Sequence, residues 1–222
     1  MNTRLTFFVF IAALAGLISC KNNDNVFPPV NTDGRFKIIN ASSNTINFFL
    51  NGTRLNNGSS LVPGGSILYI AAPLGLQNFQ FKKDGSPDIL FSWPDTLKNG
   101  INYSLYITGN TARQAFRTTE VLNPDSNLVS LGFVNAAPDA GSLDVTVGDT
   151  IRFTASAFKT QSKFLLVGNG LRDVKVYKAG TKTMLKDTSF NMDQNHVYTI
   201  FSHGLLNGTG SSKFNVGYTL NY

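Results

Sequence analysis

The two histidines, His196 and His203, are the side chains whose ordinary pKa lies closest to neutrality, which makes them the first candidates for acid–base chemistry or metal binding. They lie seven positions apart in one predicted strand, and an odd separation places two side chains on opposite faces. The chain has no His-Glu-x-x-His motif, no Gly-x-Ser-x-Gly elbow and no ligand cysteine. We therefore expect loop or strand-edge histidines, no metal site, no cofactor and no catalytic residues, so the sequence predicts a protein that is not an enzyme.

Acidic and aromatic side chains supply the next candidates. Asp139, Asp144 and Asp149 fall within eleven residues, and loop carboxylates can bind calcium through their oxygens. The simpler interpretation is that these aspartates cap turns. Trp93 precedes Pro94 at a predicted strand end, where an indole ring can stack on a sugar or pack in a core. Trp93, Asp139 and Asp144 are the possible ligand-binding residues.

Cys20 is the only cysteine, and an apolar leader precedes it. Arg4 is followed by an uncharged run from Leu5 to Leu17, which is typical of a secretory signal peptide. The run is shorter than the roughly 20 residues that span a bilayer core, which favours a removed signal over a transmembrane anchor. Residues 1–19 are therefore predicted to be a cleaved signal peptide.

The segment Leu17-Ile18-Ser19-Cys20 resembles the lipobox of bacterial lipoproteins. This resemblance implies that the Cys20 thiol is acylated and that cleavage leaves Cys20 as the mature N-terminus. A lone cysteine cannot form an internal disulfide, which agrees with that role. Because two or more acyl chains hold a protein stably to a membrane, we expect a lipid anchor in the bacterial cell envelope, at the outer membrane or cell surface.

The composition is typical of a β-rich protein with a diffuse positive charge. Charged residues make up 14% of the chain against about 25% in typical domains, and Glu120 is the only glutamate. Loss of Arg4 leaves 18 of the 19 basic residues against 13 acidic ones, a net charge of +5 that is spread over both halves. Since no basic face is concentrated, we expect no nucleic acid partner.

Turn signals divide the rest of the chain into short apolar or alternating runs. Residues 20–33 form a predicted tether, since they are polar and contain Pro28-Pro29. No segment after them shows a sustained period of 3.6 residues, so we expect no long helix. In the first half, the predicted strands are residues 36–39, 46–50, 66–70, 76–81, 89–93 and 102–107, and residues 113–121 could add another.

The second half repeats the first at a spacing of 95 residues. The matched positions are Asn40-Ala41 with Asn135-Ala136, Gly75-Leu76 with Gly170-Leu171, Gly85 with Gly180, Tyr103 with Tyr198, and Gly109 with Gly204. The repeat predicts two domains, residues 34–122 and 127–222, with a turn-rich linker between them. A unit of this length with about seven short strands is typical of an immunoglobulin-like sandwich. The predicted fold is therefore all-β, with two tandem immunoglobulin-like β-sandwich domains.

Residues 132–145, GFVNAAPDAGSLDV, resemble the opening signature of a widespread bacterial domain, domain-of-unknown-function family 4397. The resemblance implies an extracellular β-sandwich, commonly with a lipid anchor, and it supplies no activity. The first copy, from Phe36 to Ser43, departs from the signature because it lacks the Ala-Pro-Asp run. Together the two copies would cover residues 34–222.

These observations predict a membrane-anchored, non-catalytic lipoprotein that acts as a binding, interaction or structural module. Its expected partners are the membrane, through acylated Cys20, and an envelope protein or glycan. One alternative is a surface glycan-binding lipoprotein of an uptake system, which an exposed Trp93 would favour. Another is a pilus or assembly subunit that exchanges residues 214–222, where apolar side chains alternate from Phe214 to Tyr222. Full pairing of that strand within its own domain would oppose exchange.

Overall fold

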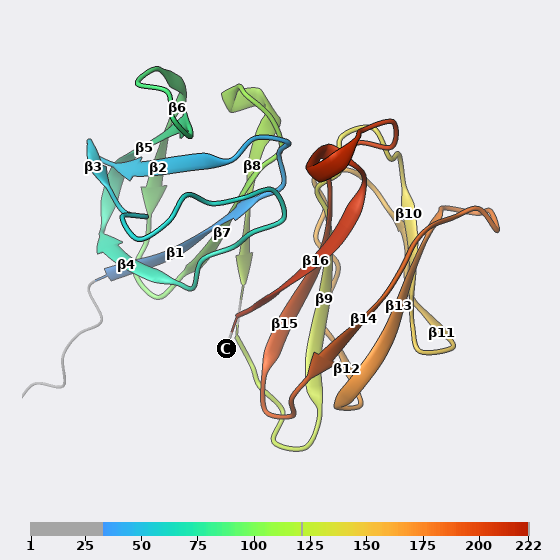
Figure 1. The fold of residues 1–222 in the computed structure, drawn as a ribbon. Coiled ribbons are helices and arrows are strands. Elements are labelled where there is room, and N and C mark those ends of the chain that lie inside the picture. The colour runs from blue at the N-terminus through green and yellow to red at the C-terminus, as the bar shows by residue number, and fades with distance from the viewer. Residues whose placement is uncertain (1–32, 121, 222) are drawn as a thin grey trace, which may run out of the picture. The chain divides into compact units, whose positions relative to one another are not determined.

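Short strands of alternating burial form two facing sheets in the first half of the chain. The computed structural model describes residues 33–120 and 122–221, so the predicted signal peptide, Cys20 and the tether up to residue 32 lie outside the described residues. The strands are β1 (Asp33–Asn40), β2 (Ile46–Leu50), β3 (Thr53–Arg54), β4 (Ile70–Pro73), β5 (Gly75–Lys83), β6 (Ile89–Leu97), β7 (Asn102–Ile107) and β8 (Ala115–Glu120). They pair in the orders β4-β1-β7-β8 and β3-β2-β5-β6 (Figure 1). β1 and β7 are parallel neighbours.

The second half has the same topology. Its strands are β9 (Val129–Asn135), β10 (Leu143–Val147), β11 (Thr150–Ser156), β12 (Leu165–Val167), β13 (Gly170–Lys178), β14 (Met184–Met192), β15 (Val197–His203) and β16 (Asn215–Leu220). They pair in the orders β12-β9-β15-β16 and β11-β10-β13-β14, and β9 is parallel to β15. This confirms the predicted all-β fold of two tandem immunoglobulin-like β-sandwiches.

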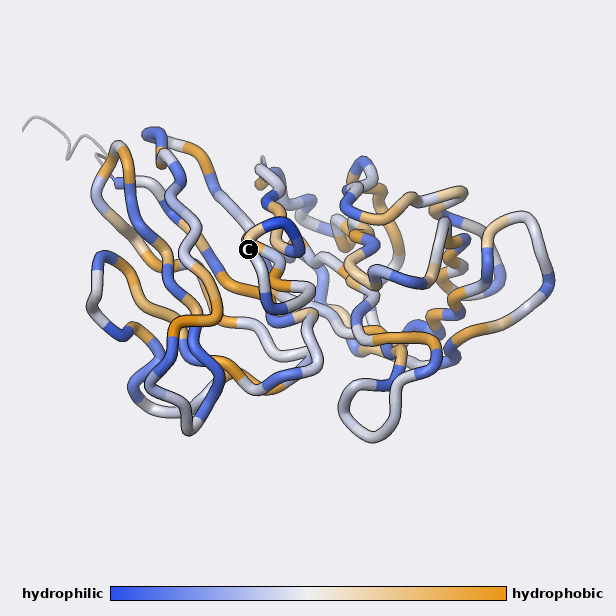
Figure 2. The backbone as a smooth tube through the Cα atoms, turned by 90° about the horizontal axis from the view of Figure 1, so that it is seen from above, coloured by the Kyte–Doolittle hydropathy of each residue, from blue (hydrophilic) through white to orange (hydrophobic). Residues whose placement is uncertain are grey.

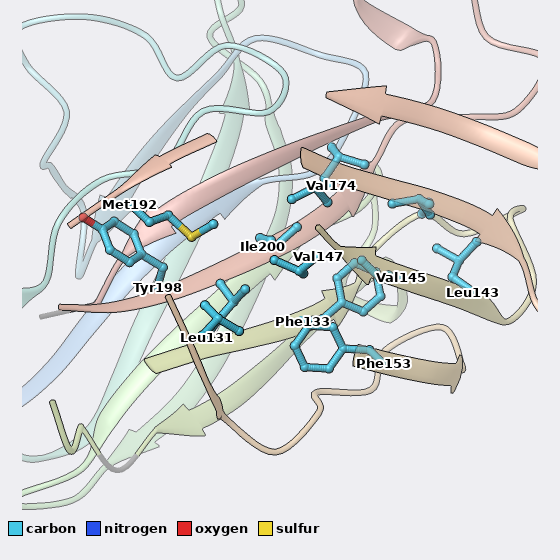
Figure 3. Close-up of a cluster of buried hydrophobic side chains, with 14 of the residues drawn as sticks. Leu131, Phe133, Leu143, Val145, Val147, Phe153, Val174, Met192, Tyr198 and Ile200 are labelled. Carbon is cyan, nitrogen blue, oxygen red and sulfur yellow. The ribbon is translucent and has the colours of Figure 1, made fainter. Parts of the chain in front are cut away.

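An apolar core lies between the two sheets of each half, because alternate side chains of each strand point inward. Figure 2 shows hydrophilic and hydrophobic positions alternating along the strands. In the second half, side chains from both sheets meet in one cluster (Figure 3), among them Leu131, Phe133, Val145, Val174 and Ile200. The first half has a corresponding cluster that includes Phe36, Ile38, Phe79, Phe81 and Leu105.

The repeated tyrosine makes the same backbone contact in both halves. The Lys98 amide donates a hydrogen bond to the Tyr103 hydroxyl at 3.1 Å, and the Asp193 amide donates to the Tyr198 hydroxyl at 3.4 Å. In each case the donor lies five positions before the tyrosine, so the hydroxyl closes the turn that leads into β7 or β15. The recurrence of tyrosine in the sequence therefore has a structural cause.

One predicted strand, residues 66–70, does not form. β4 begins at Ile70, and the backbone of Ser66 forms an isolated bridge to Ile39. Phe36 pairs with Ile70, and Ile39 pairs with Ser66. Between these two pairs the chain advances three residues in β1 but four residues in the partner segment, so the partner has one extra residue, which forms a bulge. A pattern of alternating residue types does not reveal such an insertion.

Helices are limited to two short turns among the described residues, η2 (Ala112–Gln114) and η3 (Gly210–Ser212), as the lack of a helical period predicted. Within residues 33–120 and 122–221, no helix is both long enough and apolar enough to span a membrane.

The last strand pairs within its own sandwich. All six residues of β16 pair with β15, from Tyr198 with Leu220 to His203 with Asn215. Tyr222, which the sequence placed on the same strand, lies outside the described residues. This pairing opposes the strand-exchange alternative.

Candidate functional site: a buried cluster between the two halves

Residues 32–222 form one compact unit, and a buried cluster joins its two sandwiches. Side chains alternate between the two faces of a strand, and this alternation determines which residues belong to the buried cluster. Ile38 points into the first core, so Lys37 and Ile39 point to the other face of β1. Ile200 points into the second core, so Phe201 points away from it. β9 and β15 are buried at every position, which means that both of their faces are covered.

The apolar part of this cluster is built around three aromatic rings. Tyr106 stacks on Phe116 with centroids 4.9 Å apart and planes at 10°. Phe201, from the other half of the chain, meets Tyr106 edge to face at 6.3 Å. Small and branched side chains complete the packing: Ile39, Ala41, Val134 and Ala136. The contact therefore has the character of a core rather than of a wet interface.

The polar part is centred on Glu120, the only glutamate, which is 4% exposed at the end of β8. Ser104 donates a hydrogen bond to its Oε1 at 2.7 Å, and Thr118 donates to the same oxygen at 3.3 Å. The Tyr69 hydroxyl donates to Oε2. Three hydroxyl donors therefore satisfy a carboxylate that would otherwise be costly to bury.

Lys37 is fully buried, and its amine crosses to the second half. Nζ donates hydrogen bonds to Asn221 Oδ1 and, at 3.4 Å, to Thr219 Oγ1. Asn221 Nδ2 in turn donates to Thr199 Oγ1 at 2.8 Å. The amine also lies 5.0 Å from the centroid of the Tyr69 ring. The hydrogen-bond acceptors of this buried amine are thus uncharged.

Burial shifts the ionisation of these groups. It lowers the pKa of Lys37 to about 8, a shift that the negative charge of Glu120 partly opposes. Burial also raises the pKa of the Tyr69 hydroxyl, as does the nearby charge of Glu120. The same two causes raise the pKa of Tyr106 well above its usual range. Both phenols therefore stay protonated, and Tyr69 acts as a donor to the carboxylate.

His203 belongs to the same contact, whereas His196 does not. The His203 side chain is 5% exposed, its buried Nδ1 has no hydrogen-bond partner, and its Nε2 faces Gly64 of the first half. Burial, followed by the positive charge of Lys186, lowers its pKa to about 4. His196 precedes β15, and its Nδ1 lies 2.9 Å from the Gln194 carbonyl oxygen. The two histidines are thus not brought together.

Gly64→Ala is expected to lower the free energy of unfolding by about 2 kcal/mol, because L residues are disfavoured at positive φ and a new Cβ meets a packed side chain. Gly64 has a φ of +76°, and a Cβ there would lie 2.7 Å from His203 Nε2. Gly52 is the matched control, since its φ is +84° but nothing lies within 4 Å of a Cβ. Urea unfolding should give a loss of about 1 kcal/mol for Gly52→Ala. Equal losses for the two variants would contradict the His203 contact.

Asn40 and Asn135 anchor equivalent loops. Both are fully buried at the end of the first strand of their half. Asn40 Nδ2 donates to the Asn44 and Leu61 carbonyl oxygens at 2.7 and 2.8 Å, and its Oδ1 accepts from the Ser42 amide at 3.1 Å. Asn135 holds the loop after β9 by the same kind of bonds. An asparagine is needed because this one side chain both donates and accepts.

The comparison with protein families agrees with this repeat. A family model described as a domain of unknown function, DUF4397, matches residues 34–146 and 129–215. The chain belongs to the DUF4397 family. The two overlapping DUF4397 matches together extend over most of both sandwiches, including Asn40 and Asn135. No curated protein matches the chain.

In this DUF4397 protein the candidate aspartates bind backbone amides. Asp139 accepts from the Leu206 amide at 3.0 Å, and Asp144 accepts from the Ala155 and Gly180 amides at 2.7 and 2.8 Å. Asp149 is exposed in the turn between β10 and β11. The described part of the chain holds no group of three side chains arranged to bind a metal ion. Asp139 therefore links its loop to a segment 67 positions away, and Asp144 links β10 to segments 11 and 36 positions away, so neither caps only its own turn.

Trp93 lies in β6 opposite Phe79 of β5. Its ring is half-buried and packs against the first core. Much of the indole is therefore used in packing, and a role in binding a ligand stays a prediction.

Lys37, Glu120 and Asn221 were not predicted to be parts of one site. Two signals were present. Lys37 interrupts an apolar run, Phe36-Lys37-Ile38-Ile39, and Glu120 is the only glutamate of the chain. Neither signal shows that the second face of the strand is covered, because that cover comes from the other half of the chain.

Proposed function

We propose that this DUF4397 protein is a non-catalytic, lipid-anchored protein of the bacterial cell envelope, whose two sandwiches bind a partner as one rigid body. The observation that most strongly supports a rigid pair of sandwiches is the buried amine of Lys37, which donates to Asn221 and Thr219 of the other sandwich. Domains that move freely usually share a wet, polar interface. Separating these two sandwiches would instead expose an apolar cluster and break buried polar contacts, so a partner would meet a surface of fixed geometry.

The positions of the titratable groups support a binding or structural role. Among the described residues, His196 directly precedes β15, whereas His203 is its last residue and its ring contacts Gly64. Asp139 and Asp144 are engaged by backbone amides. A nucleophilic enzyme needs a base in contact with a nucleophile and an orienting acid, an arrangement that these residues do not make.

The proposed membrane attachment is tested by Cys20→Ala. Because the thiol is the acceptor of the acyl chain, we expect this change to abolish labelling of the protein by a fatty-acid analogue in bacterial cells. The protein should then move from the membrane fraction to the soluble fraction, since each buried methylene contributes about 0.8 kcal/mol to membrane binding.

Ser19→Ala is the matched control, because it keeps a small residue before the cysteine. Labelling should persist in this variant. If Cys20→Ala remains labelled at the wild-type level, the anchor is elsewhere and this part of the proposal is wrong.

The partner class is tested with a soluble form that begins at Lys21, offered to arrays of envelope glycans and to purified envelope proteins. We expect saturable binding to a protein. Binding to a polysaccharide that is lost in Trp93→Ala would instead support glycan capture. The absence of binding to either class would contradict a binding role and leave a structural one.

A further inference from the structure

We propose that Lys37 and Asn221 react to form an intramolecular amide bond, which locks the two sandwiches together covalently. Lys37 lies in β1, the first strand, and Asn221 directly follows β16, the last strand. The two residues are 184 positions apart in the chain. The bond concerns the integrity of the protein, so it does not depend on the proposed lipid anchor or partner.

The reacting groups are already in contact. Lys37 Nζ touches the carboxamide of Asn221 at Oδ1. The other end of this carboxamide is fixed, because Nδ2 donates to Thr199 Oγ1 at 2.8 Å. The Asn221 backbone is held as well, since its amide donates to the Val197 carbonyl oxygen at 2.7 Å. Because the amine and the carboxamide are held in contact, they do not have to meet by diffusion, and bond formation is greatly accelerated.

The environment of Lys37 favours a reactive amine. The side chain is fully buried, and its hydrogen-bond acceptors are a neutral amide and a hydroxyl. The Tyr69 ring lies against Nζ and shields it further. Burial lowers the pKa of Lys37 to about 8, so part of the population carries a neutral amine near neutral pH. A desolvated, neutral lysine is an effective nucleophile.

The reaction balances without a co-reactant. The lone pair of neutral Lys37 Nζ forms a bond to Asn221 Cγ, and the carbonyl electrons move to Oδ1. One proton passes from Nζ to Nδ2. The carbonyl then reforms, the Cγ–Nδ2 bond breaks, and Nδ2 leaves as ammonia.

Exclusion of water protects both the reaction and its product. Lys37 is fully buried and Asn221 is 6% exposed, so bulk water is kept from the carbonyl carbon that it would otherwise hydrolyse. The chain has a single cysteine and cannot form an internal disulfide. An amide bond that joins β1 to the residue after β16 would give this protein a covalent cross-link, which a single cysteine cannot provide.

Peptide mass mapping of the full-length protein tests the bond directly. Trypsin does not cleave after an acylated lysine, so we expect a branched peptide that joins residues 36–54 to residues 214–222. Its mass should be one ammonia, about 17 Da, below the sum of the two peptides. Cleavage after Lys37 together with an unmodified, linear 214–222 peptide from the wild-type protein would overturn the proposal.

Two variants and one control locate the bond. Lys37→Arg keeps the positive charge but removes the reactive amine, and Asn221→Ala removes the carbonyl carbon that is attacked; both should release the linear 214–222 peptide. Lys83→Arg changes an exposed lysine of β5 and should keep the branched peptide. A branched peptide in Lys37→Arg would contradict the assignment. The wild-type map decides the question even if a variant fails to fold.

Discussion

Replacing Asn135 by alanine is expected to lower the free energy of unfolding by about 4 kcal/mol, since each lost hydrogen bond to a buried partner costs about 1 kcal/mol. The Asn135 side chain makes four such bonds. Nδ2 donates to the carbonyl oxygens of Gly141 and Ser156 at 2.8 and 2.9 Å. Oδ1 accepts from the Ala137 amide at 3.2 Å and from the Ser202 hydroxyl at 2.9 Å. All four partners lose their contact at once in the variant.

Urea unfolding followed by far-ultraviolet circular dichroism measures this loss. Asn207→Ala is the matched control, because Asn207 is an exposed turn residue, and its effect should stay within about 0.5 kcal/mol. A loss below about 1.5 kcal/mol for Asn135→Ala would mean that water or neighbouring groups replace the lost bonds, which contradicts an anchoring role.

The second large effect is a loss of stability in acid that arises from His203. Burial and the charge of Lys186 lower the pKa of this side chain from 6.5 to about 4. The unfolded chain takes up a proton as the pH falls through 6.5, whereas the folded protein does so only near pH 4. The contribution of His203 to stability is therefore full above pH 6.5 and declines as the pH falls toward 4. At pH 4 the decline amounts to about 3 kcal/mol.

A comparison with His203→Gln isolates the loss of stability that His203 causes. The carboxylates titrate in both proteins, so their effect on stability cancels in the comparison. Stability curves measured at several pH values should converge as the pH falls, with the wild-type protein losing about 3 kcal/mol more than the variant between pH 6.5 and 4. His196→Gln, which leaves His203 in place, should keep the wild-type decline. Parallel curves for the wild-type protein and His203→Gln would show that His203 is not held in its neutral form.

The fold could be predicted because its determinants are local and repeated. Period-two alternation predicted strands, and the shared positions Tyr103 and Tyr198 make the same backbone contact in both halves. The main error, the strand at residues 66–70, arose at a bulge. A bulge depends on how two strands pair, which alternation within one strand does not record.

The site between the halves was harder to predict because it depends on long-range contact. Alternation correctly separates Lys37 from Ile38, but a lysine on the outer face of a strand normally lies in water. Lys37 is instead covered by residues near the far end of the chain, including Asn221. The backbone contacts of Asp139 and Asp144 are long-range as well, because their amide partners lie 67 positions away for Asp139 and 11 and 36 positions away for Asp144, so local turn chemistry does not predict them.

The position of β1 has a mechanical consequence. This strand lies between β4 and β7 in its sheet, and its parallel ladder with β7 extends from Arg35 to Asn40. If Cys20 is acylated as proposed, tension between the membrane and a bound partner would enter the folded part of the protein through β1. A central strand pulled along its own axis shares the force among many backbone hydrogen bonds at once, so it resists being drawn out far better than an edge strand that peels away bond by bond.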